Sequence, residues 1–167
     1  MPVEHAKQNV YDLLAEKGIP YEVLEHEAVF TMEDMDKAGI TSKGTVCKNL
    51  FLRDAKGKNH FLVTVPEEKK VDLGDIAGQL YSSKLSFASP ERLDKYLGVV
   101  QGCVSPLGIL NDQNHEVTVV FDKDLCNEPA VGVHPNDNTA TIWLAFKDLQ
   151  KIIKDHGNAI EFVKLKK

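Results

Sequence analysis

Arginine is scarce in this sequence. Of its 20 basic residues, only Arg53 and Arg92 are arginine. Arginine makes the forked contacts by which many proteins hold phosphate groups, so such contacts are few here. The net charge of −5 argues against a general DNA-binding protein, which needs a broad basic surface. A partner that presents a few phosphates to one local basic patch remains compatible with this charge.

Paired cysteines and long apolar runs are missing as well. The three cysteines, Cys47, Cys103 and Cys126, are an odd number without C-x-x-C spacing, which suits a reducing compartment and no disulfide framework or structural zinc site. No apolar run approaches the roughly 20 residues of a membrane-spanning helix. The start, Met-Pro-Val-Glu-His, is too polar for a signal peptide. We therefore expect a cytoplasmic protein without a membrane partner.

Signatures of nucleotide and hydrolase sites are also absent. The sequence has no Walker A motif, no G-x-G-x-x-G and no G-x-S-x-G. None of the histidines stands at metal-ligand spacing from a second histidine or cysteine. We therefore expect neither a cofactor nor a metal ion.

The chain has the length and composition of one ordinary globular domain. It has 167 residues, 43% hydrophobic and 27% charged, with no repeat or linker, so residues 1–167 are expected to form a single domain. Periodicity predicts helices over 4–17, 31–39, 73–80, 90–98 and 147–156, and strands over 21–24, 46–53, 60–65, 85–88, 99–101, 117–121, 131–134, 139–144 and 160–165. Several predicted hairpins favour an α/β (α+β) fold with a mixed, largely antiparallel, curved sheet surrounded by helices.

Lys48 is unusual within the first predicted hairpin. Alternation places it on one face of a strand with Leu50 and Leu52, whereas Cys47 and Phe51 share the other face. An ammonium group on an aliphatic face must reach water, find an anion or face a polar pocket. The alternative is that Lys48 lies on the exposed end of the strand.

A second unusual segment is Gly102-Cys-Val-Ser-Pro106-Leu-Gly108. A tight loop with two glycines can bring several backbone N–H groups close to an oxyanion or a polarised carbonyl. His134, which precedes Pro135, is a candidate general base or pocket wall. The alternatives are a plain connecting loop and a turn histidine. Cys103 activated by His134 would make a thiol nucleophile, but no orienting third group is evident.

These features occur together in the order and spacing of a known family. Lys48-Asn49, Gly102-Cys-Val-Ser-Pro106-Leu-Gly108 and Val131-Gly-Val-His134-Pro135 with Asn138-Thr-Ala-Thr141 resemble the YbaK/prolyl-tRNA synthetase-associated editing family over nearly the whole chain. The stretches 47–54 and 59–65 resemble its free-standing ProX/PrdX-like branch. The resemblance implies a partly barrel-like sheet and hydrolysis of alanine mischarged onto proline tRNA. One methylene provides only about 1–3 kcal/mol of discrimination, so a second pocket that excludes proline by size completes the selection.

The resemblance also implies roles for individual residues. Backbone N–H groups of the loop that begins at Gly102 and contains Ser105 would hold the aminoacyl carbonyl and the developing oxyanion. Lys48 would hold the terminal adenosine with its phosphate and orient the ester, with Asn49 as a polar contact nearby. His134 would line the pocket and orient the amino group. The ribose hydroxyl of the substrate would assist the attacking water, so no protein general base is expected and positioning with electrostatics suffices.

The remaining expected contacts follow from the same resemblance. The loop would contribute further substrate contacts through Cys103, Val104, Pro106 and Gly108, and the apolar walls would be Phe30, Met32 and Leu50. Four lysines are either contacts to acceptor-stem phosphates or solvated surface: Lys43, Lys69, Lys70 and Lys84. The expected partner is proline-type tRNA, bound at its acceptor stem and 3′ end. Whether prolyl-tRNA synthetase also binds stays open.

Three alternative functions are compatible with the sequence. The YbaK type of the family removes cysteine from proline tRNA with little size selection. A catalytically silent module could instead dock tRNA or a synthetase as a regulator. A hydrolase that uses the Cys103 thiol is the third alternative.

Overall fold

The computed structural model describes residues 6–25, 45–137 and 139–165. Its α-helices are α1 (Ala6–Glu16), α3 (Leu73–Gln79), α4 (Pro90–Leu97) and α5 (Phe146–His156), with 3₁₀ helices η3 (Pro106–Asn111) and η4 (Lys123–Asn127). Its strands are β1 (Glu22–Glu25), β2 (Thr45–Arg53), β3 (His60–Pro66), β4 (Ser86–Phe87), β5 (Val117–Asp122), β6 (Val131–Val133), β7 (Ala140–Leu144) and β8 (Ile160–Val163). None of these helices is long and apolar enough to cross a membrane.

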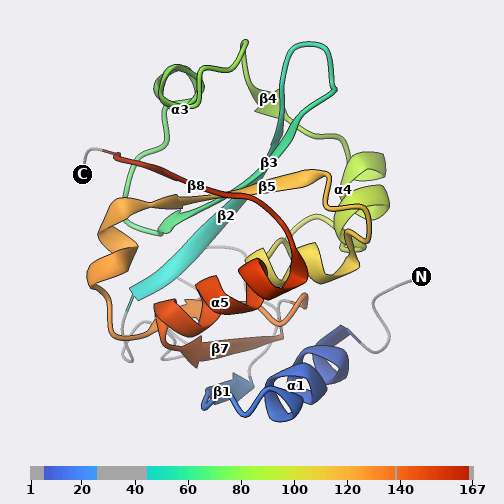
Figure 1. Cartoon of the computed structure of the whole chain (residues 1–167), viewed down its shortest axis with the longest axis vertical. Coiled ribbons are helices and arrows are strands. Elements are labelled where there is room, and N and C mark those ends of the chain that lie inside the picture. The colour runs from blue at the N-terminus through green and yellow to red at the C-terminus, as the bar shows by residue number, and fades with distance from the viewer. Residues whose placement is uncertain (1–5, 26–44, 138, 166–167) are drawn as a thin grey trace.

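The described strands form one mixed sheet. Their order is β1-β7-β6-β2-β3-β5-β8, with β4 paired to β2 beside this path. The predicted mixed sheet with helices around it is confirmed (Figure 1). Antiparallel pairings outnumber parallel ones by only four to three in this part of the chain. β1 and β8 end the order, so the described sheet stays open and does not close into a full barrel.

Strand β2 is where the sheet divides. One of its edges pairs with β3 over residues 47–53. The other edge pairs with β6 at residues 45–46 and with β4 at residues 52–53. Between those contacts, no described strand pairs with this edge of β2. Figure 1 shows the hairpin of β2 and β3 rising from this point, away from α1 and β1.

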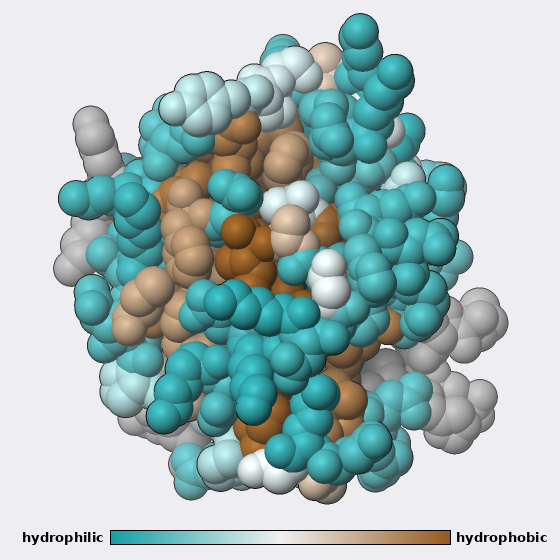
Figure 2. All heavy atoms as spheres, viewed as in Figure 1, coloured by the Kyte–Doolittle hydropathy of each residue, from teal (hydrophilic) through white to brown (hydrophobic). Residues whose placement is uncertain are grey.

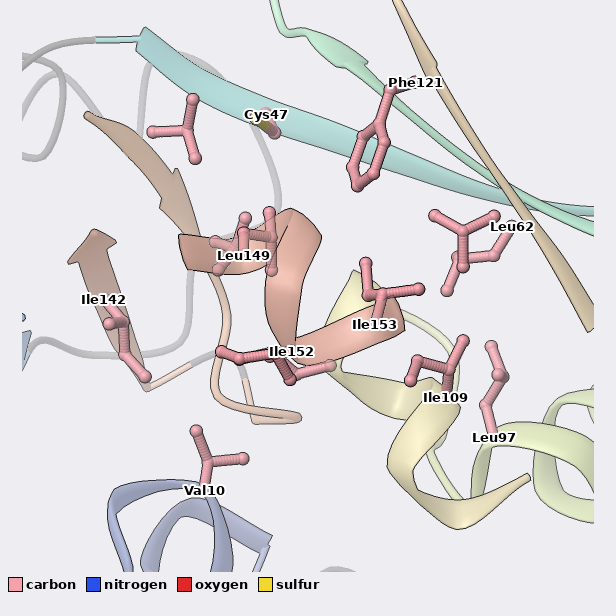
Figure 3. Close-up of a cluster of buried hydrophobic side chains, with 14 of the residues drawn as sticks. Val10, Cys47, Leu62, Leu97, Ile109, Phe121, Ile142, Leu149, Ile152 and Ile153 are labelled. Atoms are coloured by element: carbon pink, nitrogen blue, oxygen red, sulfur yellow. The ribbon is translucent and has the colours of Figure 1, made fainter. Parts of the chain in front are cut away.

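Alternation along β2 sends its side chains into two hydrophobic cores. Cys47 and Phe51 join the larger core, in which α5 contributes Leu149 and its apolar neighbours. Figure 3 shows Cys47 on the side of β2 that faces Leu149. Leu50 and Leu52 belong to the second core, beside α3. The predicted division of the two faces is therefore confirmed, and Lys48 lies on the face of the second core.

The elements before and within the glycine-rich loop differ from the prediction. Residues 99–101 were expected as a strand but form no strand. Val99 is buried there in the larger core, so its apolar character reflects packing without sheet pairing. The chain turns at Gly102, whose φ of 92° favours glycine, and Ser105 then caps η3. The helix predicted over residues 31–39 lies outside the described residues.

A buried ion cluster joins the end of β3 to η4. Lys69 is only 2% exposed, and its Nζ lies 2.6 Å from Oδ2 of both Asp122 and Asp124. It also donates to the carbonyl of Leu165 at 3.0 Å. Burial lowers the pKa of Lys69, but the hydrogen bonds to the two aspartates outweigh burial and hold that pKa above its ordinary value. Both sequence alternatives for Lys69, a phosphate contact and a solvated side chain, are therefore wrong.

Replacing this lysine should destabilise the fold strongly. In Lys69→Met, Asp122 stays buried without its counter-charge, so we expect the free energy of unfolding to fall by about 3–5 kcal/mol in urea titrations at pH 7. The matched control is Lys70→Met at the exposed neighbouring position, expected within about 0.5 kcal/mol of the unaltered protein. Equal stability of the two variants would contradict the assigned role of the cluster.

Candidate active site

A cavity of about 430 Å³ opens along the part of β2 that lacks a described strand partner. This volume lies within the roughly 300–1,000 Å³ of small-molecule sites. The lining comes from β2, the end of β3, the segment from β4 into α4, the glycine-rich loop and the end of β6. The lining residues are Cys47, Lys48, Asn49, Leu50, Phe51, Glu67, Phe87, Ala88, Pro90, Leu93, Gln101, Gly102, Val104 and His134.

Lys48 lines this pocket. The alternative prediction, that Lys48 lies on the exposed end of the strand, is therefore wrong. The residue is half-buried, and its ammonium group donates to the main-chain carbonyl of Lys69. Lys69 is itself held by the buried Asp122 and the partly exposed Asp124. The position of the Lys48 ammonium is therefore tied to the ion cluster through one hydrogen bond.

Asn49 lies beside Lys48 but on the opposite face of β2. Its Oδ1 accepts a hydrogen bond of 2.7 Å from the hydroxyl of Thr64, its cross-strand partner on β3. This bond fixes the side chain from the buried side of the sheet. The amide NH₂ group is left as the part of Asn49 that can donate to a carbonyl or hydroxyl of a ligand.

The glycine-rich loop brings Gly102 and Val104 to the pocket. Within the loop, the N–H of Cys103 donates to a preceding carbonyl at 3.1 Å, and the N–H of Leu107 donates to Ser105 Oγ at 3.2 Å. The candidates for binding an oxygen atom of a ligand are therefore the N–H groups of Gly102 and Val104, which line the pocket. Preorganised backbone donors of this kind stabilise negative charge as it develops on a carbonyl oxygen.

His134 is the pocket residue from the end of β6. Its main-chain carbonyl accepts a hydrogen bond of 2.5 Å from Ser105 Oγ, which joins the loop to this strand end. Its ring Nδ1 lies 3.4 Å from the carbonyl of Ala140. Because a carbonyl only accepts, this contact requires the proton on Nδ1 and leaves Nε2 of the neutral ring as an acceptor.

Several residues expected at the site lie elsewhere. Four residues of the loop are buried behind the pocket and do not line it: Cys103, Ser105, Pro106 and Gly108. Ser105 serves as the cap of η3 and the bridge to His134, while Cys103 joins the larger core. Phe30, Met32 and Lys43 fall outside the described residues, whereas Lys70 and Lys84 are exposed. Leu50 lines the pocket, as expected of a wall residue.

Glu67 is a pocket residue that the sequence analysis missed. It follows β3 directly and its N–H donates to the carbonyl of Val46, so its side chain shares a face of the sheet with Lys48. Burial raises the pKa of the Glu67 carboxyl, and the nearby Lys48 only partly offsets this. The sequence offered no signal for it, because Glu67 opens a run of four charged residues that is typical of an exposed loop.

The described residues offer no group of three or more His, Cys, Asp or Glu side chains that could hold a metal ion. Cys47 borders the pocket, but burial raises the pKa of its thiol and so disfavours the nucleophilic thiolate. The chemistry available in the described site is therefore one ammonium group, one carboxyl, one imidazole, the amides of Asn49 and Gln101, and a set of backbone donors.

Comparison with known proteins gives this geometry a context. Residues 26–152 match the aminoacyl-tRNA editing domain. The chain is 49% identical over 160 residues to the prolyl-tRNA editing protein ProX of Acetoanaerobium sticklandii, covering 96% of this chain and 98% of that protein. It is 38% identical to the prolyl-tRNA synthetase associated domain-containing protein 1 of Bos taurus, covering 87% and 86%. A solved structure described as a putative trans-editing enzyme for prolyl tRNA synthetase has the same fold, with a TM-score of 0.74, 23% identity and 99% coverage of both chains.

The burial of Cys103 predicts how the thiols react. Cys103 is 7% exposed and Cys47 is 4% exposed, whereas Cys126 is exposed. In the native protein, iodoacetamide should label Cys126 at least about tenfold faster than the other two, as followed by peptide mass spectrometry. A Cys126→Ser control should take up almost no label before unfolding. If Cys103 were labelled as fast as Cys126, the result would support the alternative in which the Cys103 thiol is the nucleophile.

Proposed function

The chain belongs to the aminoacyl-tRNA editing domain family, and we propose that its substrate is alanyl-tRNA of the proline type. As a member it is a hydrolase that deacylates mischarged tRNA, in which water cleaves the ester between the amino acid and the 3′-terminal ribose. We further propose that residues 1–167 work as one editing domain, in the cytoplasm, where charged tRNA is used. The names of relatives suggest prolyl-tRNA synthetase as a further partner.

One observation carries this proposal. The pocket on β2 brings together a half-buried ammonium group, an amide and a loop of backbone donors, on residues that the sequence places far apart. An aminoacyl ester is already activated toward water, so its hydrolysis needs correct placement and stabilisation of the oxyanion more than a strong base. The pocket supplies groups for both tasks.

The roles follow from where each group lies. The backbone N–H groups of Gly102 and Val104 donate hydrogen bonds to the aminoacyl carbonyl oxygen and stabilise the negative charge that develops on it. Lys48 binds the 3′-terminal nucleotide and orients the ester, and Asn49 adds a polar contact. His134 borders the amino acid. The attacking water is assisted by the ribose hydroxyl of the substrate, and the tetrahedral intermediate then collapses to free amino acid and tRNA.

Glu67 is the candidate partner of the substrate's α-ammonium group. The α-ammonium group of an aminoacyl ester is a cation that must lose water on entering the pocket, so an unpaired entry would be costly. Glu67 is the carboxylate among the described lining residues, and it lies on the face of Lys48. We assign it the α-ammonium group of the substrate, next to His134.

Size accounts for selection of alanine. Proline and alanine differ by few carbon atoms, so a pocket that binds proline cannot fully exclude alanine, whereas a smaller pocket can exclude proline. The walls given by Leu50, Phe51 and Val104 are apolar and provide no thiol-specific contact. This favours alanine over cysteine as the substrate, with cysteine as the alternative.

The central test is deacylation of matched substrates. Alanyl-, prolyl- and cysteinyl-tRNA of the proline type are incubated with the protein, and release of free amino acid is followed. Alanine should be released fastest, and prolyl-tRNA should persist. Lys48→Ala should lower kcat/KM by about 100-fold, since it removes positioning of the ester, whereas the exposed Lys147→Ala on α5 should not.

Each other outcome of this assay points to a specific alternative. Faster release of cysteine than alanine would assign the YbaK type of specificity. Retention of all three esters, with tRNA still bound, would assign the silent docking module. Full activity of Lys48→Ala would remove Lys48 from the site.

The carboxyl of Glu67 predicts an acid limb in the pH profile. The pKa of the Glu67 carboxyl lies above its ordinary value of 4.5. As the pH falls toward this raised pKa, the carboxylate gains a proton, and the neutral carboxyl no longer pairs with the ammonium group of the substrate. We expect KM for alanyl-tRNA to rise as the pH is lowered. Glu67→Gln should raise KM at pH 7 about 10-fold or more, because a charge-assisted hydrogen bond contributes roughly 1.5–3 kcal/mol, and should lose the acid limb. The exposed Glu68→Gln is the control; an unchanged limb in Glu67→Gln would contradict the assignment.

A further inference from the structure

The two arginines of the chain lie together, although 39 positions separate Arg53 from Arg92. A methyl group placed on Gly57 would be 2.9 Å from an Nη2 of Arg92 and 3.3 Å from Nη2 of Arg53. The tip of the β2–β3 hairpin therefore draws both guanidinium groups to one place. Arg92 donates to the carbonyl of Gly57 at 3.3 Å, and Arg53 donates to the carbonyl of Ala55 at 3.1 Å.

These like charges are held by main-chain carbonyls and, for Arg92, also by the ring of His60, whose Nε2 lies 2.8 Å from Nη1 of Arg92; no acid holds them. The carboxylate nearest in sequence, Asp54, is 7% exposed and accepts from the N–H groups of Lys58 and Asn59 inside the hairpin loop. No ion pair between either arginine and an acid occurs in the described part of the chain. Two cations held side by side without an acid form a surface prepared for an anion.

Further lysines extend this surface, which we call the hairpin–α4 patch: Arg53, Lys56, Lys58, Arg92 and Lys95. The lysines in it are exposed. Figure 1 shows the hairpin projecting above α4, and Figure 2 shows its tip as a hydrophilic column at the top of the molecule. α4 also carries the exposed acids Glu91 and Asp94. Even when these two acids are counted, the five basic residues of the patch leave it a net positive charge, in a chain whose total charge is −5.

An exposed aromatic ring lines the pocket near the arginine end of β2. Phe87 lines the pocket, yet 63% of it is exposed. On β4 it pairs with Leu52, and its neighbour Ser86 pairs with Arg53. Phe87 thus stands one residue step from the arginine end of β2. Single-stranded nucleic acids are bound in this way, with bases stacked on aromatic rings and phosphates held by basic side chains.

We propose that the single-stranded 3′ end of tRNA leaves the pocket across Phe87, with one base stacked on this ring, and that Arg53 and Arg92 bind the phosphates that follow. This inference rests on the proposed function and gives the direction in which its substrate lies. β2 spans about 17 Å from Lys48 to Arg53 at 3.3–3.4 Å per residue, so the patch reaches nucleotides beyond the terminal adenosine.

The charges along β2 match those of the substrate. The carboxyl of Glu67 lies at the Lys48 end of the strand, where the α-ammonium group binds, and the arginines lie at the other end. An aminoacyl-tRNA end has the same polarity, with a cation on the amino acid and phosphates on the RNA. The opposite orientation would bring phosphates to Glu67 and Glu68, where like charges repel.

The test compares a long and a short substrate for the same reaction. Deacylation kinetics are measured with full alanyl-tRNA of the proline type and with 3′-alanyl-adenosine, which is too short to reach the patch. Arg53→Gln/Arg92→Gln should raise KM for the tRNA about 10- to 100-fold, with a loss at least tenfold larger than on alanyl-adenosine. The slope of log KM against log salt should fall by about one for each lost phosphate contact. Lys147→Gln/Lys151→Gln on α5 is the matched charge control.

The aromatic contact has its own variants. Phe87→Ala should raise KM for alanyl-tRNA more than for alanyl-adenosine. Phe87→Trp should keep KM close to that of the unaltered protein, because any aromatic ring can stack. Tyr81→Ala, at a ring 97% exposed elsewhere, is the control. Circular dichroism melts confirm that each variant is folded.

The outcomes separate this inference from the proposed function. Equal losses on both substrates, or no loss on either, would overturn the inference while the function stands. Failure of the unaltered protein to hydrolyse either substrate would overturn the function itself.

Discussion

The site depends on how strand β2 divides its two edges. The N–H of Glu67 donates to the carbonyl of Val46, so residues 46, 48 and 50 are the ones whose main chain bonds to β3, and the main chain of residues 47, 49 and 51 faces the other edge. There, Ala88 donates to the carbonyl of Phe51, and β6 pairs only with the beginning of the strand. Main-chain polar groups need partners, so the intervening edge is suited to a polar ligand. The separation of the sheet along this edge of β2 therefore accounts for the position of the pocket.

Two polar residues of the pocket, Lys48 and His134, are held in place by residues behind the pocket. Asp122 and Asp124 hold the buried Lys69, and the carbonyl of Lys69 receives the ammonium group of Lys48. On the opposite wall, Ser105 caps η3 and binds the carbonyl of His134. Lys48 and His134 are thus held by residues that do not line the pocket. Such support matters because hydrolysis by positioning fails when groups move by about 1 Å.

Sequence reasoning reached the parts of this account that depend on local pattern. Alternation placed Lys48 on one face of β2 and Cys47 on the other, and the glycines of the loop indicated backbone donors beside His134. It did not reach what depends on pairing between distant segments. The burial of Lys69 follows from aspartates more than 50 positions away, and Glu67 reaches the pocket only because β3 ends beside β2. Apolar residues around Val99 were mistaken for a strand because packing and pairing leave the same pattern.

The central claim is that the open edge of β2 is where the mischarged amino acid is hydrolysed. The most direct measurement is a crystal structure with alanyl-adenosine in which an amide replaces the ester, so that the ligand persists. The account predicts its carbonyl oxygen about 2.7–3.1 Å from backbone N–H groups of the Gly102 loop, with the alanyl group between Leu50 and His134. An analogue bound instead in the cavity between α1 and η3, lined by Asn9 and Asn136, would contradict it.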